Sequence, residues 1–371
     1  MRVAIDTRKL RDFGIGTYVR NLVQQLSSID ANTEYLLLCR PTDKQWPIPL
    51  GNNFRTIAQR SPNYSLREQF SLPLTLKRMG VELFHAPHYV LPALTPCRSI
   101  VTIHDCIHLR FPQYLPSSFA YTYAKTQIWT AIRRSNRILT VSESSKQDIL
   151  HFFDVDEDKI TVIHNAIDDR LRISPSEEAM VRVRERYQLP SRFLMYSGNV
   201  KPHKNLERLI EAFKLIHDDG DKELGLLITG SEVSKYATLR RAIHRYRLHK
   251  HVRFLGYQST ETLSALYRLA DVFVFPSLYE GFGLPPLEAL ACGTPVVASN
   301  VSSLPEVLGN AALLVDPYSP QSIRQGIRSI LDNKSLRADL RKKGLARARL
   351  FSWEQSIRRV LKIYNEVISN G

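Results

Sequence analysis

The sequence has few cysteines, and their spacing fits neither a metal site nor a disulfide framework. None of the four belongs to a Cys-x-x-Cys pair; they are Cys39, Cys97, Cys106 and Cys292. Zinc ribbons and disulfide-rich folds need such pairs or regular spacings, so neither class is expected. We therefore expect a reducing compartment and predict that the chain is cytoplasmic.

Long apolar runs are also missing. No uninterrupted apolar stretch reaches the roughly 20 residues that a transmembrane helix needs. The first ten residues, MRVAIDTRKL, lead directly into a strand-like run with charges around it. We therefore expect a soluble protein without a signal peptide.

Acidic residues are outnumbered by basic ones. The 51 Lys and Arg residues exceed the 36 Asp and Glu residues and give a net charge of +15. The excess is spread over both halves, with +6 through Arg172 and +9 after it. Such a charge fits an anionic small ligand, an acidic membrane surface or nucleic acid, and it does not choose among them. A general bias of the surface explains it as well.

The chain does contain a long alternation of strand and helix patterns. Short apolar runs such as Val3–Ile5, Leu83–His85 and Ser99–His104 are each followed by a turn and an amphipathic stretch, and the second half repeats this series. Such alternation indicates parallel sheets with helices on both faces. Because 371 residues are too many for one core, we predict an α/β fold of two doubly wound, Rossmann-like domains. Ligands are expected in a central cleft that both domains face.

Interruptions of this pattern predict the domain boundaries. The polar segment 167–180 lacks strand character and separates the two series. We expect a first domain over residues 1–172 and a second domain over residues 173–351. Residues 352–371 form a terminal amphipathic helix with Ser352 as its N-cap, and we expect this helix to cross back to the first domain.

The segment YEGFGLPPLE, residues 279–288, holds two carboxylates with seven residues between them. Its prolines predict the start of a helix that ends at Gly293, with Glu288 in the first turn and Glu280 in the preceding loop. The loop and helix start are expected to bring backbone N–H groups close to a diphosphate, through Gly281, Phe282, Gly283 and Leu284. Both acids then accept hydrogen bonds from sugar or ribose hydroxyls. The alternative is that Glu288 complements the helix dipole and Glu280 is a turn residue.

A second constellation is SGNVKPHKNLERLIEAF, residues 197–213. A strand ends at Tyr196, a turn of small residues follows, and Lys204 comes just before an amphipathic helix. A lysine in this place neutralises phosphate as a compact charge, and Lys201 offers a second cation. The alternative is that both lysines are solvated loop charges. The turn itself contributes further candidate ligand-binding residues, Ser197, Gly198 and Asn199.

Together these motifs resemble the retaining glycosyltransferases of family 4, group 1. The family's frame Glu-Gly-Phe-Gly-Leu-Pro-x-x-Glu is complete at residues 280–288, and VFPS, GTPVVAS, LPEV and LLVDP around it are similar too. The resemblance covers essentially the whole chain and implies a GT-B fold. It implies transfer of a hexose from a nucleotide diphosphate sugar to an acceptor hydroxyl, with retained configuration, no required metal and no other cofactor. The G-x-x-x-P-x-K-N-L variant resembles that of bacterial polysaccharide mannosyltransferases, which points to GDP-mannose.

The resemblance also implies roles for residues of the second domain. Lys204 and the amides at the helix start would stabilise the leaving phosphate, Glu280 would orient the sugar, and Glu288 would bind the ribose. Many family members have an arginine where this chain has Asn199, so Lys201 or backbone amides are expected to share the phosphate with Lys204. The chain also has Ala166 where the family often has glycine.

In the first domain the resemblance points to two places. Gly14 and Gly16 stand where the family has a glycine loop between strand and helix, close to phosphate or acceptor. The alternative for this loop is a plain tight turn. His104, in TIHD at a strand end, resembles the family's histidine beside the transferred sugar and completes the predicted catalytic set with Glu280 and Lys204. Its alternative is a structural histidine whose hydrogen bonds are satisfied.

Other functions stay open at this point. A sugar-nucleotide epimerase shares the GT-B fold, and a basic nucleic-acid-binding protein would fit the charge, although no aromatic–basic module supports it. We expect a nucleotide-sugar donor and a saccharide or lipid-linked acceptor as partners, and no nucleic acid. Residues 117–137 mix aromatic residues and arginines at helical spacing and offer peripheral contact with the inner face of the membrane. The alternative is an ordinary helix that buries its aromatic face.

Overall fold

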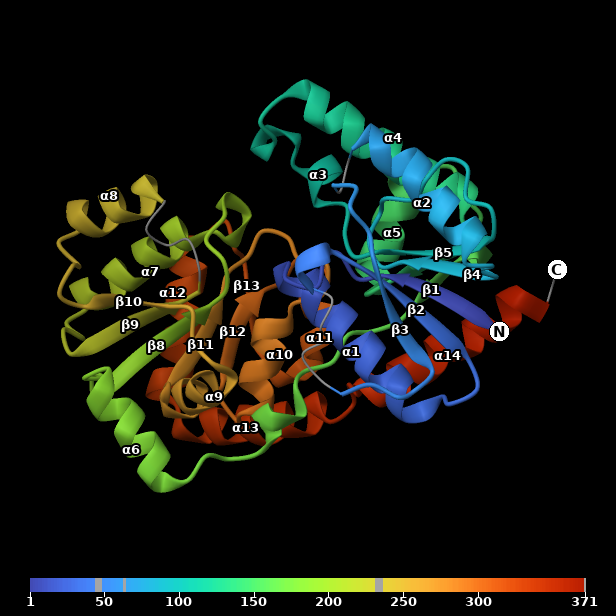
Figure 1. Ribbon diagram of the computed structural model, residues 1–371. Helices are drawn as coiled ribbons and strands as arrows, with labels where there is room; N and C mark the ends of the chain where they lie inside the picture. The colour runs from blue at the N-terminus through green and yellow to red at the C-terminus, as the bar shows by residue number, and fades with distance from the viewer. Residues whose placement is uncertain (44–48, 63–64, 231–235, 370–371) are drawn as a thin grey trace. The chain divides into compact units, whose positions relative to one another are not determined.

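The computed structural model describes residues 1–43, 49–62, 65–230 and 236–369. The chain forms two compact units (Figure 1). The first unit comprises residues 1–165 together with 352–371, and the second unit comprises residues 166–351. The chain therefore passes from one unit to the other twice, at 165/166 and at 351/352.

The described part of the first unit is built on a seven-stranded parallel sheet in the order β3-β2-β1-β4-β5-β6-β7. Its central strands are buried almost throughout, as parallel strands covered on both faces must be. The strands are β1 (Arg2–Asp6), β2 (Glu34–Cys39), β3 (Phe54–Ala58), β4 (Leu83–Ala86), β5 (Arg98–Ile103), β6 (Arg137–Thr140) and β7 (Ile160–Val162).

Helices cover both faces of this sheet (Figure 1). On one side lie α1 (Phe13–Ile29) and α14 (Trp353–Ser369), which contact each other. The other side carries α2 (Leu66–Arg78), α4 (Ser118–Arg134) and α5 (Glu143–Phe152), and a short α3 (Ile107–Arg110) precedes α4.

The C-terminal helix α14 belongs to the core of the first unit. The hydroxyl of the fully buried Tyr364 lies 2.5 Å from Nδ1 of His85 in β4. Burial, together with the nearby His104 and His88, lowers the pKa of His85 to about 3. His85 is therefore neutral at physiological pH and takes part in the packing of α14 as an uncharged group.

The described part of the second unit contains a six-stranded parallel sheet in the order β10-β9-β8-β11-β12-β13. The predicted α/β architecture with two doubly wound parallel sheets is thereby confirmed. The strands are β8 (Arg192–Ser197), β9 (Leu224–Thr229), β10 (Val252–Gly256), β11 (Val272–Phe275), β12 (Val296–Ser299) and β13 (Leu313–Val315). The helices are α6 (Glu177–Arg186), α7 (Leu206–Asp218), α8 (Ala237–Arg245), α9 (Thr260–Leu269), α10 (Leu284–Ala291), α11 (Leu304–Leu308), α12 (Pro320–Asp332) and α13 (Lys334–Ala348).

The order of the second sheet has a consequence for the site. The chain leaves β8 toward β9 on one side and returns through β10 to place β11 on the other side. The order in which strands are added to the sheet therefore reverses between β8 and β11. Open α/β sheets bind their ligands at the carboxyl ends of the two strands beside such a reversal.

Candidate functional site

The segment YEGFGLPPLE forms a loop and the first part of α10. The helix begins at Leu284, two residues before Pro286, which the sequence predicted as its first residue, and Gly283 precedes it with a left-handed φ of 95°. A side chain at Gly283 would be strained in this conformation, and its Cβ would lie 2.6 Å from Cδ2 of Leu304. Gly293, with a φ of 76°, follows the end of the helix as predicted.

The predicted residues Lys204 and Glu280 are in direct contact. Lys204 ends a 3-10 turn (Pro202–Lys204) after β8, and Glu280 lies in the loop after β11. Nζ of Lys204 lies 2.6 Å from Oε1 of Glu280, and the two side chains are only 13% and 12% exposed. The ammonium also lies 5.6 Å from the ring centroid of Phe275. A cation and a carboxylate thus lie together at the carboxyl edge of the sheet. An ammonium group binds anions, and a carboxylate accepts hydrogen bonds from hydroxyl groups.

Asn205 holds the turn that carries Lys204, and the sequence interpretation missed it. It adopts a left-handed φ of 61° and is 2% exposed. Its side-chain NH₂ donates to the carbonyl oxygens of Pro276, at 2.9 Å, and Pro317, at 2.7 Å. Its side-chain oxygen accepts a bond of 2.8 Å from Arg208. Asparagine is tolerated in this backbone conformation better than most residues, which is the signal that the K-N-L sequence carried.

The loop around Glu280 is held through its backbone by two serines. The Glu280 N–H donates to Oγ of Ser302 at 3.0 Å, and the hydroxyl of Ser303 donates to the Glu280 carbonyl at 3.0 Å. Both serines follow β12, the next strand of the sheet. The carboxylate is therefore positioned by main-chain contacts and its side chain is left to pair with Lys204.

Glu288 does not lie in the first turn of α10, as predicted, but in the second. The helix begins earlier than the prolines indicated, so the carboxylate is too far from its N-terminus to complement the dipole. Oε2 of Glu288 instead accepts a 2.9 Å hydrogen bond from the hydroxyl of Tyr267 in α9. Burial raises the pKa of Glu288 to about 7; the Tyr267 bond lowers it and the charge of Asp168 raises it.

The remaining predicted residues of the second unit lie in the two segments that carry Lys204 and Glu280. Ser197 ends β8 and is 8% exposed, whereas the Lys201 side chain is exposed. Asn199 Oδ1 is buried without a hydrogen-bond partner among the described residues. Gly198 has a φ of 150° and Gly281 is partly buried. Phe282 is buried, and Leu284, the first residue of α10, is partly buried.

The ring of Phe282 meets that of Phe351. Their centroids are 5.7 Å apart in an edge-to-face arrangement. Phe351 is the last residue of the second unit before the chain returns to the first. Arg172 donates to the Phe351 carbonyl at 2.8 Å.

In the first unit, the predicted glycine loop is part of a helix. Gly14 and Gly16 lie in the first turn of α1, and Gly14 is exposed. The Gly16 N–H donates to the carbonyl of Asp12 at 2.5 Å. A Cβ at Gly16 would lie 2.3 Å from the carbonyl oxygen of Leu10, so only glycine fits there. The loop between β1 and α1 is formed by the residues before these glycines.

His104 follows β5 at its carboxyl end, as predicted. Its Nε2 lies 3.0 Å from the carbonyl oxygen of Pro87, which can only accept, so Nε2 carries the proton and Nδ1 is an acceptor. The ring meets Tyr18 edge to face at 5.0 Å. Burial lowers the pKa of His104, and although the Pro87 bond opposes this, the charge of Lys9 lowers the pKa further. The histidine is therefore neutral at physiological pH.

A cluster of buried charges lies beside the end of β1. Arg8 donates to both carboxylate oxygens of Asp6, at 2.8 and 2.6 Å, and also pairs with Glu68. His88 Nε2 lies 3.2 Å from Oδ2 of Asp6, and all four side chains are 1% exposed or less. Burial opposes ionisation of Asp6, but the charges and hydrogen bonds of Arg8 and His88 together outweigh it, and the pKa of Asp6 is lowered. Nothing in the spacing of these four residues along the chain indicated this contact.

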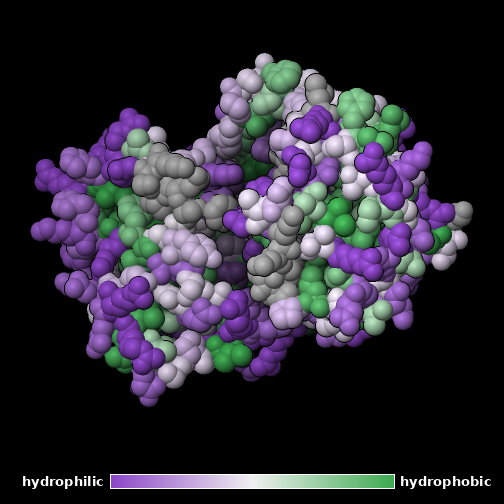
Figure 2. Space-filling view, in the orientation of Figure 1, coloured by the Kyte–Doolittle hydropathy of each residue, from purple (hydrophilic) through white to green (hydrophobic). Residues whose placement is uncertain are grey.

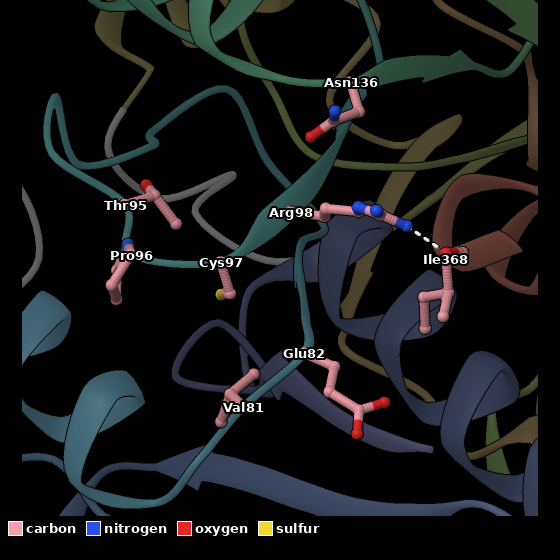
Figure 3. A pocket seen from close by; sticks show the side chains of 8 residues that line it. All are labelled: Val81, Glu82, Thr95, Pro96, Cys97, Arg98, Asn136 and Ile368. Carbon is pink, nitrogen blue, oxygen red and sulfur yellow. Dashed lines mark hydrogen bonds between the residues drawn. The ribbon is translucent and has the colours of Figure 1, made fainter. Parts of the chain in front are cut away.

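One pocket of the described structure lies away from all of these residues. It has a volume of about 620 Å³ and is lined by residues at the amino ends of β4 and β5, including Cys97 and Arg98, and by Ile368 of α14 (Figure 3). Arg98 points across it to the carbonyl of Ile368 (Figure 3). Among the described residues there is no cluster of His, Cys, Asp and Glu that could hold a metal, and no helix long and apolar enough to cross a membrane.

Comparisons with known proteins match both units. The family model "Glycosyl transferases group 1" matches residues 182–347, and "Glycosyltransferase Family 4" matches residues 14–171. O-antigen chain mannosyltransferase B of Escherichia coli is 34% identical over 284 residues, which cover 76% of this chain and 74% of that protein. The serotype-specific mannosyltransferase WbdA of Escherichia coli is 28% identical over 74% of this chain, but the match spans only 34% of WbdA. The structure of Anabaena Alr3699/HepE in complex with UDP and glucose superposes with a TM-score of 0.81 at 17% identity, over 99% of this chain and all of that chain.

Proposed function

The chain belongs to glycosyltransferase family 4, the group 1 glycosyltransferases, and from this premise we propose that it transfers mannose from GDP-mannose to a saccharide or lipid-linked saccharide. The predicted family, the GT-B fold and the transferase activity are confirmed, and neither the epimerase nor the nucleic-acid alternative is supported. The proposal of mannose as the sugar rests on similarity to mannosyltransferases. That of a polysaccharide product rests on the O-antigen chain enzyme.

The observation that carries the proposed site is the contact between Lys204 and Glu280. The two residues stand at the carboxyl ends of adjacent strands, where a nucleotide diphosphate sugar would bring a diphosphate and sugar hydroxyls. In our proposal Lys204 stabilises the negative charge that develops on the leaving diphosphate. Glu280 accepts hydrogen bonds from the sugar hydroxyls, and Glu288 accepts them from the ribose.

The proposed reaction retains the anomeric configuration. The bond from the anomeric carbon to the phosphate oxygen breaks while the acceptor oxygen bonds to the same face of the sugar. The acceptor proton passes to the leaving phosphate, so no side chain has to move it. His104 contributes Nδ1 as an acceptor for a sugar hydroxyl from the first unit, which we propose as the acceptor side.

We propose that this chemistry needs no metal ion. Lys204, Lys201 and the amides at the start of α10 supply the positive charge and the N–H donors for the diphosphate. Asn199 stands where relatives have an arginine, and we propose that Lys201 compensates, since its side chain is exposed beside the same turn.

Thermal-shift measurements with GDP-, UDP- and ADP-sugars test the donor. We expect GDP-mannose to raise the melting temperature most and EDTA to leave transfer unchanged. Lys204→Ala, Glu280→Ala and Glu288→Ala should abolish transfer while the far-UV circular dichroism stays that of the wild type. If UDP-sugars alone stabilise the protein, the donor carries UDP and not GDP. Wild-type turnover in all three variants would refute the proposed site.

We further propose that the enzyme works at the cytoplasmic face of the membrane and contacts it through α4. This helix buries an aliphatic face that includes Ala124 and Ile128, and of its aromatic residues Tyr121 packs partly against the core, as the alternative interpretation expected. Phe119 is 77% exposed and Trp129 is 50% exposed, with the Arg133 guanidinium 5.7 Å from the Trp129 ring. Hydrophobic side chains are visible on the surface over α2 and α4, among hydrophilic ones (Figure 2). Aromatic and basic side chains on one helix are typical of interfacial membrane contact.

Flotation with liposomes tests this contact. The chain should float with vesicles of phosphatidylglycerol and phosphatidylcholine, and less with phosphatidylcholine alone. The variant Phe119→Ser/Trp129→Ser should float less while its transfer to a soluble acceptor is unchanged. Absence of flotation with the anionic vesicles would refute the membrane contact and leave the transferase activity untouched.

A further inference from the structure

Tyr267 in α9 is a fully buried tyrosine of the second unit. Its ring meets Phe273 of β11 edge to face, with centroids 5.3 Å apart. Its carbonyl accepts a 2.6 Å hydrogen bond from the hydroxyl of Thr294. Both ends of the residue are thus held, and the ring has little freedom. A buried phenol needs a hydrogen-bond partner, so the identity of that partner tells what the residue is for.

The partner of the Tyr267 hydroxyl is the carboxylate of Glu288. The hydroxyl donates to Oε2 at 2.9 Å. Burial and the charge of Glu288 raise the pKa of Tyr267 well above its usual value, so the phenol keeps its proton and stays a donor. Ser197, at the end of β8, opposes this rise in the pKa of Tyr267 without reversing it. The phenol of α9 therefore holds one oxygen of the carboxylate in α10.

The two carboxylate oxygens of Glu288 differ in their hydrogen bonding. Oε2 is held by Tyr267, and Oε1 has no hydrogen-bond partner in the part of the chain that the structure describes. Titratable groups approach the carboxylate from three elements: Tyr267 from α9, Asp168 from the segment before the 3-10 turn 169–172, and Cys292 from the end of α10 itself. Of these, only Tyr267 stabilises the ionised form, because Asp168 is of like charge.

We infer that Tyr267 is a positioning residue of the donor site: it holds Oε2 of Glu288 so that Oε1 meets the ribose hydroxyls of the nucleoside diphosphate. The inference rests on the proposed function, in which Glu288 binds the ribose. It adds that the selectivity for ribose over deoxyribose depends on a side chain that does not itself touch the nucleotide. A carboxylate that is free to rotate or that carries a proton accepts fewer hydrogen bonds from the same hydroxyls.

The variant Tyr267→Phe in the full-length chain tests this, because it removes one oxygen and keeps the ring. The probe is whichever of GDP, UDP and ADP stabilises the wild type most, with its 2′-deoxy and 3′-deoxy forms. Binding is measured by calorimetry between pH 6 and 9. We expect the variant to bind the ribonucleotide about tenfold or more weakly at pH 7, as for loss of a hydrogen bond to a charged group. Its preference for ribose over deoxyribose should shrink toward one.

The pH profile separates positioning from mere packing. The Tyr267 bond lowers the pKa of Glu288, which is about 7, so its loss raises that pKa. The ionised carboxylate is the better acceptor, so affinity falls as the pH drops through the pKa of Glu288. The profile of the variant should therefore shift to higher pH, and the loss relative to the wild type should be smaller at pH 9 than at pH 7. An affinity loss that is the same at every pH would overturn the inference.

Two controls distinguish failure of the inference about Tyr267 from failure of the proposed function. Tyr246→Phe removes a hydroxyl from another tyrosine of the same unit, 3.5 Å from Glu211, and should leave binding and its pH profile unchanged. Glu288→Gln should lose the ribose preference and the pH dependence together. Wild-type binding by Glu288→Gln would refute the ribose role of Glu288 itself. Loss in Glu288→Gln with wild-type binding in Tyr267→Phe would refute only the role of Tyr267.

Discussion

The side chain of Asn205 offers a sharp test of how the donor site is built. Its NH₂ group is shared between the carbonyls of Pro276 and Pro317, which lie after β11 and β13, and its backbone adopts a left-handed φ of 61°. Lys204 immediately precedes it. Asn205→Gly keeps the backbone conformation and removes the hydrogen bonds, whereas Asn205→Ala removes the same bonds and adds strain.

The magnitude follows from the two carbonyls. Each buried acceptor left without a partner costs about 1–3 kcal/mol, and we take about 3 kcal/mol for the pair in Asn205→Gly. In a unit of this size about 1 kcal/mol lowers the melting temperature by roughly 2–4 °C, so we expect a fall of roughly 6–12 °C. Asn205→Ala should lose about 1 kcal/mol more, through its left-handed backbone. Transfer activity should fall in both variants because the turn that carries Lys204 is no longer held.

Differential scanning calorimetry of the wild type and the two variants measures this, with turnover followed by release of the nucleoside diphosphate. A matched control is Asn333→Gly, which removes an exposed cap of α13 that bonds only to the Leu336 N–H. We expect this substitution to lower the free energy of unfolding by only about a few tenths of a kcal/mol. If Asn205→Gly melts within about 2 °C of the wild type, or if Asn205→Ala is no worse than Asn205→Gly, the reasoning is wrong.

Three further predictions concern other parts of the chain. Glu68→Gln should destabilise the first unit by about 3–5 kcal/mol, because Arg8 loses one of its buried charge partners; thermal unfolding checks this, and a change below about 1 kcal/mol would contradict it. The free energy of unfolding should fall by about 1.4 kcal/mol per pH unit below pH 6.5 on account of His85. The reason is that this histidine binds a proton below pH 6.5 in the unfolded chain but only below about pH 3 in the folded chain. Urea unfolding between pH 7 and 4 should show this slope. In His85→Asn the slope of the unfolding free energy against pH should be smaller by the contribution of one proton. Gly283→Ala should strain the backbone and meet Leu304, so that donor affinity and stability fall together, and a variant with wild-type values of both would refute the argument.

Local rules explain why some features could be predicted. The prolines and glycines of YEGFGLPPLE restrict the backbone within a few residues, and they placed the start of α10 to within two positions. The same segment carried the family resemblance, and the matches to the two glycosyltransferase models confirm it. This error had a consequence, because the late predicted start put Glu288 in the first turn, whereas it lies in the second turn and away from the helix dipole.

Edge strands show where such rules fail. β3 was not predicted, because it pairs on one side only and its residues are mostly half-buried or exposed, so the apolar run that identified other strands is missing. The glycines at 14 and 16 were expected in a loop between strand and helix, because the family resemblance places a glycine loop there. They lie instead in α1, where Gly16 is required by the closeness of the Leu10 carbonyl.

The sequence by itself therefore determined the kind of fold and the family, and it pointed to the two acids and the lysine that we propose bind the donor, because these inferences depend on residues that are neighbours in the chain. The tertiary structure decided which side chains meet. Lys204 reaches Glu280 across 76 positions because β8 and β11 are adjacent in the sheet, and Tyr267 reaches Glu288 because α9 and α10 bracket β11. Hydrogen bonds and ion pairs act over about 3 Å, a distance that spacing along the chain does not constrain once the chain has turned back on itself.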